Sequence, residues 1–253
     1  MLTRLNGIFA FALWDARKRE LFLARDGMGV KPLYYAALSC GFMFASEIKA
    51  LVREKRLRRD IDADALRSYL TYLWCPAPRT MIRDVKKLEP GHALIVHGGA
   101  VMRKWCFYTL PLVSASSAID SHEATETTRK LLAQAVERQM VADVPVGAFL
   151  SGGLDSSSIV HFARQYAPAN RVDCFAIGFT GGQWAQEGFA EDLPYARQAA
   201  KHLGVDLHEI QVGPELWQQL ETMLYHLDEP QADPAPLNVL AWHQGFALRG
   251  RGR

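Results

Sequence analysis

The feature that most constrains this chain is the run Val146–Ser157, V-G-A-F-L-S-G-G-L-D-S-S. Its first part, Val146–Leu150, is a short apolar run with a glycine, which is typical of a buried strand. The residues that follow it, Ser158–Arg164, carry apolar side chains at helical spacing. We therefore predict a strand, a loop of small residues with one carboxylate, and then a helix.

This loop has the composition of a nucleotide phosphate site. Backbone N–H groups at a helix start can point at an anion, with the helix dipole behind them. Gly152 and Gly153 have no Cβ, so a phosphate can approach the main chain closely, and Asp155 can hold a divalent cation that bridges phosphate oxygens. It is not a Walker A loop, because G-x-x-x-x-G-K-[ST] is absent from the sequence. The alternative is a glycine-rich turn with a serine or aspartate N-cap, which S-G-G alone would favour.

The same string resembles the S-G-G-x-D-S-S loop of ATP-pyrophosphatase domains. Three earlier segments resemble class II glutamine amidotransferase domains: Leu5–Asp15, Ala24–Tyr35 and Phe44–Leu51. Two later segments fit the same order of motifs: Phe175–Phe179 and Asp228–Pro230. Together, from Leu5 to about Leu240, the chain resembles the glutamine-hydrolysing asparagine synthetase family.

The resemblance implies two domains of different fold. Residues 1–111 are expected to be the C-terminal part of a class II glutaminase domain, an α+β remnant of an Ntn-type sandwich. Residues 112–121 are the expected linker, because they are small, polar and without periodicity. Residues 122–253 are expected to be the N-terminal part of the ATP-binding domain, with the α/β parallel-sheet fold of ATP-pyrophosphatases (adenine nucleotide alpha hydrolase-like).

The resemblance also implies a nucleotide site with Mg²⁺. The expected ATP-binding residues are the loop and one aliphatic residue at the end of the next strand: Leu150, Ser151, Gly152, Gly153, Leu154, Asp155, Ser156, Ser157 and Ile177. Asp155 is the expected Mg²⁺ ligand beside the pyrophosphate of ATP. In open parallel sheets, ligands bind beyond the carboxyl ends of strands, which suits Leu150 and Ile177. Position alone fits two ordinary core aliphatics equally well.

In the similar glutaminases, the residue that matches Asp26 binds the amino group of substrate glutamine. Arg25 and Asp26 lie with two glycines in a predicted turn, so the alternative is an aspartate that hydrogen-bonds its own backbone. These enzymes use an N-terminal cysteine as nucleophile, whereas here Met1 is followed by Leu-Thr-Arg. No catalytic residue is therefore assigned, and we expect this polypeptide to lack glutaminase activity.

The implied activity is that of asparagine synthase, a carbon–nitrogen ligase. Aspartate is amidated in an ATP-dependent reaction through a β-aspartyl-adenylate, with ammonia from glutamine. The implied small molecules are glutamine, aspartate, ATP and Mg²⁺, and a homodimer is a further expectation. Two alternatives remain: a related amidotransferase that acts on another carboxylate acceptor, and a non-catalytic truncated product.

The composition limits the classes of partner and the cellular compartment that we expect for this chain. The net charge of +2 gives no argument for nucleic acid or an anionic membrane, and no apolar run reaches the length of a membrane span. The four cysteines, Cys40, Cys75, Cys106 and Cys174, lie far apart without C-x-x-C spacing. We therefore expect free thiols in a reducing cytoplasm.

The first half of the chain is strand-rich. The expected strands are Gly7–Trp14, Leu21–Ala24, Phe42–Ala45 and a hairpin of Ala93–Val96 with Val101–Trp105. Asp62–Tyr72 is expected to be a helix.

The second half alternates helix and strand, which indicates a parallel sheet. The expected helices are Glu123–Met140, with Leu131, Leu132, Ala135 and Val136 on its inner face, the helix after Asp155, a helix capped by Asp192 that ends at Leu203, and Pro214–Leu227. The expected strands, after the one that ends at Leu150, are Val172–Ile177 and Val205–Val212.

Both ends of the chain depart from the family's pattern. The upstream glutamine-binding segments and the second loop, S-G-x-G-x-D-E, do not occur, and Ala241–Arg253 has the Arg and Gly content of GC-rich codons out of frame. We interpret the chain as a fragment produced by a frameshift or a contig-edge gene model. We expect it to be poorly stable, because it would leave unpaired strand edges.

Overall fold

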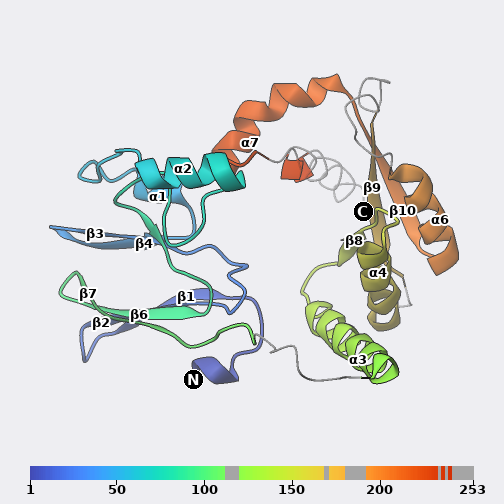
Figure 1. The fold of residues 1–253 in the computed structure, drawn as a ribbon, viewed down its shortest axis with the longest axis horizontal. Helices are drawn as coiled ribbons and strands as arrows, with labels where there is room; N and C mark the ends of the chain where they lie inside the picture. Colours follow the sequence, from blue (N-terminus) through green and yellow to red (C-terminus); the bar gives the residue numbers. More distant parts are fainter. Residues whose placement is uncertain (112–119, 168–170, 180–191, 233–234, 237–238, 241–253) are drawn as a thin grey trace. The chain divides into compact units, whose positions relative to one another are not determined.

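The structure is a computed structural model that describes residues 1–111, 120–167, 171–179, 192–232, 235–236 and 239–240. It is a mixed α/β structure with several sheets, and it divides into two compact units (Figure 1). The first unit comprises residues 1–113 and 222–233, and the second comprises 114–221 and 234–253. In the described part, no helix combines the length and apolarity needed to cross a membrane.

The first unit contains two antiparallel sheets. One has the strand order β1-β2-β6-β7, formed by Ala10–Asp15, Glu20–Arg25, His92–His97 and Ala100–Cys106. The other has the order β4-β3-β5, formed by Gly41–Ala45, Tyr34–Leu38 and Lys86–Lys87. The predicted strand Gly7–Trp14 is present but begins only at Ala10. The predicted strands at Leu21–Ala24 and Phe42–Ala45 are confirmed, and so is the hairpin of β6 and β7.

Apolar side chains from both sheets form the core between them. Leu23, Leu94 and Val96 from the four-stranded sheet pack with Tyr35 and Phe42 from the three-stranded sheet. This packing follows from strand alternation, which sends every second side chain to the same face.

The outer faces of the two sheets are covered in part. A row of aromatic rings lies on the far side of the four-stranded sheet near η1 (Leu2–Arg4): Phe11 meets Phe22 edge-to-face, and Phe22 stacks on Trp105. On the other side of the three-stranded sheet, α1 (Ile48–Leu51) packs on Ala36. The predicted helix from Asp62 is α2 (Ala63–Tyr72), and the Asp62 carboxylate caps it by accepting from the N–H groups of Asp64 and Ala65.

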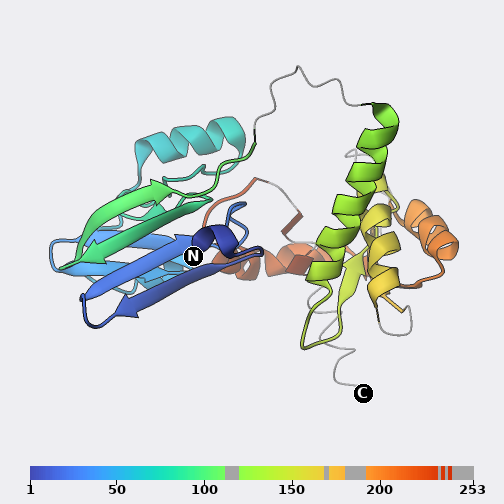
Figure 2. The same ribbon diagram turned by 90° about the horizontal axis from the view of Figure 1, so that it is seen from below.

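The second unit contains a parallel sheet of order β10-β9-β8. Its strands are Gly147–Phe149 (β8), Asp173–Phe179 (β9) and Asp206–Val212 (β10), and its helices are Ser121–Gln139 (α3), Leu154–Tyr166 (α4) and Leu193–Leu203 (α6). α3 and α4 run side by side, as Figure 2 shows. One apolar cluster joins α3, α4, β9 and α6 through Val136, Val160, Cys174 and Ala200, so these helices cover the same face of the sheet. The predicted alternation of helix and parallel strand is therefore confirmed.

Several predicted details are wrong. On α3, Leu131 and Ala135 are exposed, and the inner face is Leu132 and Val136, which pack in the apolar cluster with α4 and β9. β9 does not end at Ile177 but continues to Phe179, which pairs with Val212.

Two helix starts also differ from the prediction. Asp192 stands at the N-cap of α6, but its side chain makes no capping hydrogen bond, since its own backbone is already helical. The predicted helix Pro214–Leu227 is two elements, a 3₁₀ helix, η3 (Pro214–Gln219), followed by α7 (Leu220–Leu227).

Candidate functional site

The predicted phosphate loop lies between β8 and α4, at the carboxyl end of a parallel strand (Figure 1). The Leu150 N–H donates to the Phe175 carbonyl at 2.9 Å, so pairing with β9 continues up to the first residue of the loop. The loop then crosses to α4, whose first turn contains Asp155. The sheet therefore fixes where the loop begins, and the helix fixes where it ends.

The serine hydroxyls hold the loop in one conformation. The hydroxyls of Ser151 and Ser156 lie 3.0 Å apart, and the Ser156 Oγ accepts from the Ser151 N–H. The Ser151 Oγ accepts from the Gly153 N–H at 3.3 Å, and the Ser156 hydroxyl donates to the Gly153 carbonyl at 3.2 Å. These bonds close a small ring across the loop, which leaves it preorganised before any ligand arrives.

The two glycines of the loop have different surroundings. Gly152 has φ +83°, and an ideal Cβ there would lie 2.3 Å from the Tyr195 carbonyl carbon and 2.6 Å from the Ala196 nitrogen. Gly152 is therefore required for packing against the first turn of α6. A Cβ at Gly153 would meet only the Ser151 hydroxyl, at 3.4 Å, so the space beside Gly153 is open.

No side chain caps the start of α4. Its N-cap residue is Gly153, and no side-chain capping hydrogen bond forms there. The predicted alternative, a serine or aspartate N-cap, is therefore wrong. Orphan N–H groups at a helix start carry partial positive charge and favour an anion.

Asp155 is exposed on the first turn of α4. Within the described residues, no hydrogen bond or ion pair engages its carboxylate, and no group of three or more His, Cys, Asp or Glu side chains could hold a metal by itself. A single carboxylate suits Mg²⁺ that is bound together with phosphate oxygens and water, because Mg²⁺ keeps several waters and takes one or two carboxylates from a protein. The donor set present here therefore fits a nucleotide-bound Mg²⁺.

The two aliphatic residues of the predicted site lie in the sheet. Leu150 is 1% exposed and packs in the core with Val160 and Cys174, and its N–H is engaged by the Phe175 carbonyl. Ile177 is half-buried in β9. The residue after it, Gly178, lies within the strand rather than at its end, since β9 continues to Phe179. A Cβ at Gly178 would lie 2.8 Å from a methyl carbon of Leu193, so α6 packs closely there.

Asp26 belongs to the first unit and follows β2 directly. Its side chain is buried, and Oδ1 accepts from the N–H groups of Met28 and Val30 while Oδ2 accepts from that of Lys31. Burial by itself opposes ionisation, but the backbone donors of Lys31, Val30 and Met28 outweigh it and hold the pKa of Asp26 below its ordinary value. The carboxylate therefore stays charged and organises the turn, with one acceptor position left on Oδ2.

The neighbouring Arg25 fixes the same turn from its other side. Its guanidinium donates to the carbonyls of Gly29, Lys31 and Leu88 at 2.5–2.7 Å. Burial lowers the pKa of Arg25 below its ordinary value. The Arg25–Asp26 pair thus clamps residues 26–31 through backbone groups alone.

A third cluster was not predicted from the sequence. The Asp228 carboxylate accepts from the N–H groups of Ile48 and Lys49 at 2.7 and 3.3 Å, and it pairs with the Lys49 ammonium at 3.0 Å. Glu229 pairs with the Lys87 ammonium at 2.6 Å, with both side chains 12% exposed. The motif Asp228–Pro230 fits the order of motifs in the sequence, but its basic partners lie far away in the chain and carry no local signal.

The buried Glu229 carboxyl is only partly satisfied. Its Oε2 meets Lys87, and the Tyr34 hydroxyl interacts with the same group. Its Oε1 is buried without a hydrogen-bond partner in the part of the chain that the structure describes. Burial raises the pKa of Glu229 in spite of the opposing effect of Lys87, and burial together with Glu229 raises that of Tyr34. The Glu229 carboxyl is therefore sensitive to the loss of Lys87, the cation that pairs with it among the described residues.

Two family profiles match the chain. That of the glutamine amidotransferase domain matches residues 1–107, and that of asparagine synthase matches residues 127–245. Residues 222–233, which belong to the first compact unit, thus lie inside the second match.

Curated relatives align along nearly the whole chain. Glutamine-hydrolysing asparagine synthetase 1 of Bacillus subtilis (strain 168) is 34% identical over 257 residues, which cover 99% of this chain and 39% of the relative. A putative glutamine-hydrolysing asparagine synthetase of Mycobacterium bovis is 36% identical over 264 residues, covering 100% of this chain and 39% of the relative. An amidase of Penicillium rubens is 29% identical over 266 residues, which cover 98% of this chain and 38% of the relative.

The chain therefore spans 39% of the length of these two synthetases. The two domain matches follow one another in the same order as the glutaminase-like and synthetase-like motifs. The chain therefore joins a match to the glutamine amidotransferase domain to a match to asparagine synthase, and along nearly its whole length it is similar to glutamine-hydrolysing asparagine synthetases.

Proposed function

We propose that this chain is part of an asparagine synthetase that takes its nitrogen from glutamine. In the complete protein, one domain releases ammonia from glutamine, and the other amidates aspartate after its side-chain carboxylate has been activated by ATP. The observation that carries this proposal is the uncapped, preorganised loop before α4, together with the two domain matches. We place the protein in the cytoplasm and propose a homodimer, as for a biosynthetic enzyme of this kind.

The domain assignment follows the same proposal. Residues 1–111 form part of an Ntn-type glutaminase sandwich, which the two stacked antiparallel sheets support. Residues 122–253 form part of an ATP-pyrophosphatase-type domain, which the parallel sheet with its loop after β8 supports. Residues 112–121 join them.

In the proposed ATP site, the chain contributes positioning and charge. The orphan N–H groups of the first turn of α4 bind the phosphates, and the open space at Gly153 lets them come close. The ring of Ser151 and Ser156 keeps these donors in place, so that little reorganisation is needed when charge develops on the leaving pyrophosphate. The main chain at Leu150 and the side chain of Ile177 border the nucleotide.

Mg²⁺ would be held by Asp155 and would neutralise charge on the phosphate oxygens. The exposed carboxylate on the first turn of α4 supports this role. Ser157 donates its N–H to Gly153 within the helix, which leaves its hydroxyl for a ligand.

On the glutaminase side, we propose that Asp26 receives the amino group of glutamine on Oδ2. The three backbone donors keep this carboxylate ionised and aimed, and one acceptor position remains on that oxygen. Arg25 holds the turn in which Asp26 lies.

A second candidate is a related amidotransferase with another acceptor. It is favoured by the amidase of Penicillium rubens, which aligns along the chain as the synthetases do. Both candidates share the ATP loop, so they differ only in which carboxylate is activated.

The proposal is tested by calorimetric titration of the chain with ATP·Mg²⁺. Asp155→Asn removes the proposed metal ligand while keeping the side-chain volume, so affinity should fall by about tenfold when Mg²⁺ is present and change little when EDTA is present. Asp143→Asn is the matched control, because it is the same substitution at an exposed residue before β8. Equal Mg²⁺-dependent affinities of the wild type and Asp155→Asn would contradict the metal role, and no binding of ATP at all would contradict the site.

A further inference from the structure

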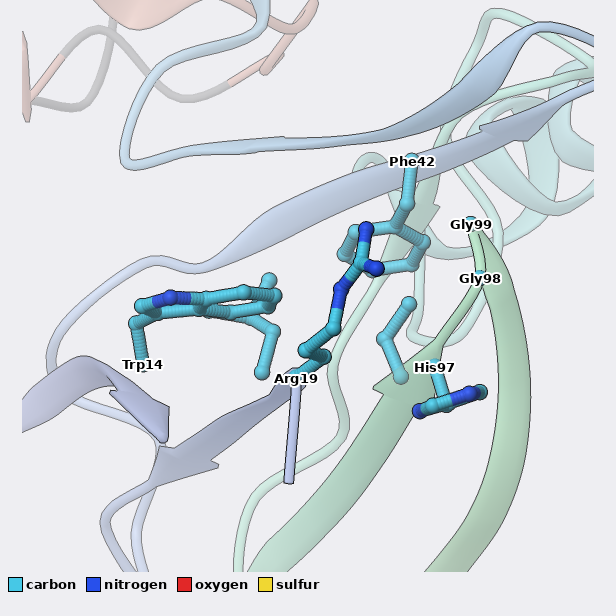
Figure 3. A pocket seen from close by; sticks show the side chains of 8 residues that line it. Trp14, Arg19, Phe42, His97, Gly98 and Gly99 are labelled. Carbon is cyan, nitrogen blue, oxygen red and sulfur yellow. The ribbon is translucent and has the colours of Figure 1, made fainter. Parts of the chain in front are cut away.

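A pocket lies in the first unit, and the proposed function does not use it. It encloses about 480 Å³ and is lined by Trp14, Arg19, Phe42, His97 and the glycines of the β6–β7 turn (Figure 3). Arg19 immediately precedes β2, whereas Asp26 immediately follows it. A strand of this length spans roughly 20 Å, so the hollow is separate from the proposed glutamine site.

Strand register builds one wall of this pocket. Trp14 of β1 pairs with Leu21 of β2, and Leu21 pairs with Val96 of β6. Paired residues on adjacent strands point to the same face of a sheet, so these three side chains form one apolar row.

The opposite wall comes from the other sheet. Phe42 of β4 stacks on Tyr35 of β3, with ring centroids 5.7 Å apart and planes inclined by 21°. This stacking fixes the orientation of the Phe42 ring. The pocket is therefore a slot with the apolar row that contains Trp14 on one side and the Phe42 ring on the other.

Arg19 supplies a cation at the rim of the slot. In the view of Figure 3, its side chain reaches toward Phe42, with Trp14 on one side and His97 on the other. Among the described residues, nothing forms a hydrogen bond or an ion pair with its guanidinium. The nearest acidic neighbour in sequence, Glu20, alternates with Leu21 along β2 and so points to the other face of the sheet.

The backbone at Arg19 is unusual for an arginine. Its φ is 55°, in the left-handed region that glycine enters without cost and other residues at a cost of roughly 1–2 kcal/mol. The turn that imposes this conformation is held by Asp15, whose Oδ1 accepts from the N–H groups of Arg17 and Lys18. A side chain kept at a position that favours glycine points to a use for that side chain.

The β6–β7 turn closes the remaining side. Gly98 and Gly99 both have positive φ, as a two-residue type I′ turn requires. A Cβ at Gly99 would lie 3.1 Å from the Cα of Gly41, so this turn comes close to the one between β3 and β4. His97, the residue before these glycines, adds a second nitrogen-bearing ring to the rim.

We propose that this pocket binds a small planar aromatic carboxylate. Its ring lies between Trp14 and Phe42, and its carboxylate pairs with the guanidinium of Arg19. Aromatic rings favour offset stacking on one another, and a guanidinium has the planar fork that matches a carboxylate with two parallel hydrogen bonds.

The test uses the full chain and 2-naphthoate as the probe, followed by calorimetric titration. Arg19→Gly is the informative variant, because glycine relieves the left-handed backbone while the cation is lost. We expect its melting temperature to equal or exceed that of the wild type and its affinity for 2-naphthoate to fall about tenfold or more. Arg17→Gly is the control, since it removes the same charge from the same turn at a residue that does not line the pocket.

Two further measurements separate the ring from the charge. Trp14→Ala should weaken 2-naphthoate binding, and the neutral 2-naphthamide should bind the wild type at least about tenfold more weakly than 2-naphthoate. Affinity that is the same for wild type and Arg19→Gly, or for the acid and the amide, would overturn the proposal, as would failure of 2-naphthoate to bind. A lower melting temperature for Arg19→Gly, with unchanged affinity, would mean that Arg19 only covers the pocket.

Discussion

Gly152 and Gly153 are adjacent in the chain, but a side chain added at each meets different surroundings. At Gly152 it meets the backbone of Tyr195 and Ala196, and at Gly153 it meets only a hydroxyl at the edge of open space. Stability and phosphate access are therefore assigned to different glycines of the same loop.

This difference gives a paired prediction. We expect Gly152→Ala to lower the free energy of unfolding by about 2–4 kcal/mol, because overlap with a packed backbone and a left-handed φ each cost roughly 1–3 kcal/mol. We expect Gly153→Thr to leave stability nearly unchanged, because threonine caps a helix about as well as glycine. Its affinity for ATP·Mg²⁺ should nevertheless fall about tenfold or more, since a branched side chain fills the phosphate position and its hydroxyl competes for the same N–H groups.

Denaturant unfolding and calorimetric titration of both variants check this prediction. If Gly153→Thr bound ATP·Mg²⁺ as the wild type does, the loop would be a turn without a phosphate role. If Gly152→Ala unfolded like the wild type, the close contact with α6 would be wrong.

The sequence predicted the residue types of this loop but not their separate roles. The glycines, serines and Asp155 could be placed on a strand–loop–helix because apolar spacing is local information. That Gly152 faces α6 depends on a helix that begins some forty residues later in the chain. Likewise, the turn at Asp26 could be predicted, but its burial and its three backbone donors could not.

At the scale of elements, the segment that follows α7 is held on α1 and β5 by charged groups. Asp228 binds the N-terminal N–H groups of α1 together with Lys49, and Glu229 meets Lys87 of β5. Glu229 is largely buried, with its side chain 12% exposed, and within the described residues Lys87 is the cation that pairs with it. Breaking a buried pair from one side leaves a charge without compensation, which is costly.

We therefore expect Lys87→Met to destabilise the chain by about 3–5 kcal/mol at neutral or higher pH. The pKa of Glu229 is already raised in the folded protein, and loss of Lys87 raises it further. A carboxyl with a raised folded pKa favours folding in its protonated form, so stability is lost as pH rises through that pKa. The difference in melting temperature between wild type and variant should thus widen from about pH 5 to about pH 8.

Thermal melts of three variants across this pH range test the pairing. Lys86→Met is the control, because it is the neighbouring lysine on the same short strand and makes no ion pair among the described residues. The double variant Lys87→Met/Glu229→Leu should recover much of the loss, since both charges are gone. A pH-independent deficit in Lys87→Met would show that packing rather than charge is responsible.

Element boundaries illustrate what local pattern can and cannot predict. The strands β2, β4, β6 and β7 and the helix α2 follow from alternation, turn residues and an aspartate cap, all of which are local. The strand Tyr34–Leu38 was not predicted, because its run of two tyrosines and two alanines has no alternation of polar and apolar residues. Leu131 was placed on the inner face of α3 because it is apolar, but it is 59% exposed, since no element packs on that side in the described part.

In the whole molecule, neither compact unit is a single continuous stretch of the chain. Residues 222–233 cluster with the first unit, although the linker proposed at 112–121 separates them from it in sequence. Asp228 and Glu229 attach this segment to the first unit through their side chains. A backbone hydrogen bond attaches it as well, because the Ala232 N–H donates to the Leu73 carbonyl at 3.1 Å. The first unit is therefore complete only with a segment from the second domain match.

We predict that a fragment of residues 1–113 is less stable than the same unit in the full chain, and that a peptide of residues 222–232 restores part of the difference. Binding should depend on the two carboxylates, because they supply the ion pairs with Lys49 and Lys87. A peptide with Asp228→Asn and Glu229→Gln should bind about tenfold or more weakly, as each charged hydrogen bond contributes roughly 1.5–3 kcal/mol. Thermal melting of the fragment with either peptide, or with a scrambled one, provides the measurement. Equal effects of the two peptides would contradict the predicted charge dependence.

The segment at Asp228–Glu229 has a consequence for domain exchange between relatives. A crossover at residues 112–121 would bring Tyr34, Lys49 and Lys87 from one parent together with Asp228 and Glu229 from the other. A chimera would then fold well only if both parents use matching charges at these places. Compatibility between swapped halves is thus set by a small acidic segment far from the junction, and a crossover that also transfers residues 222–233 would avoid the mismatch.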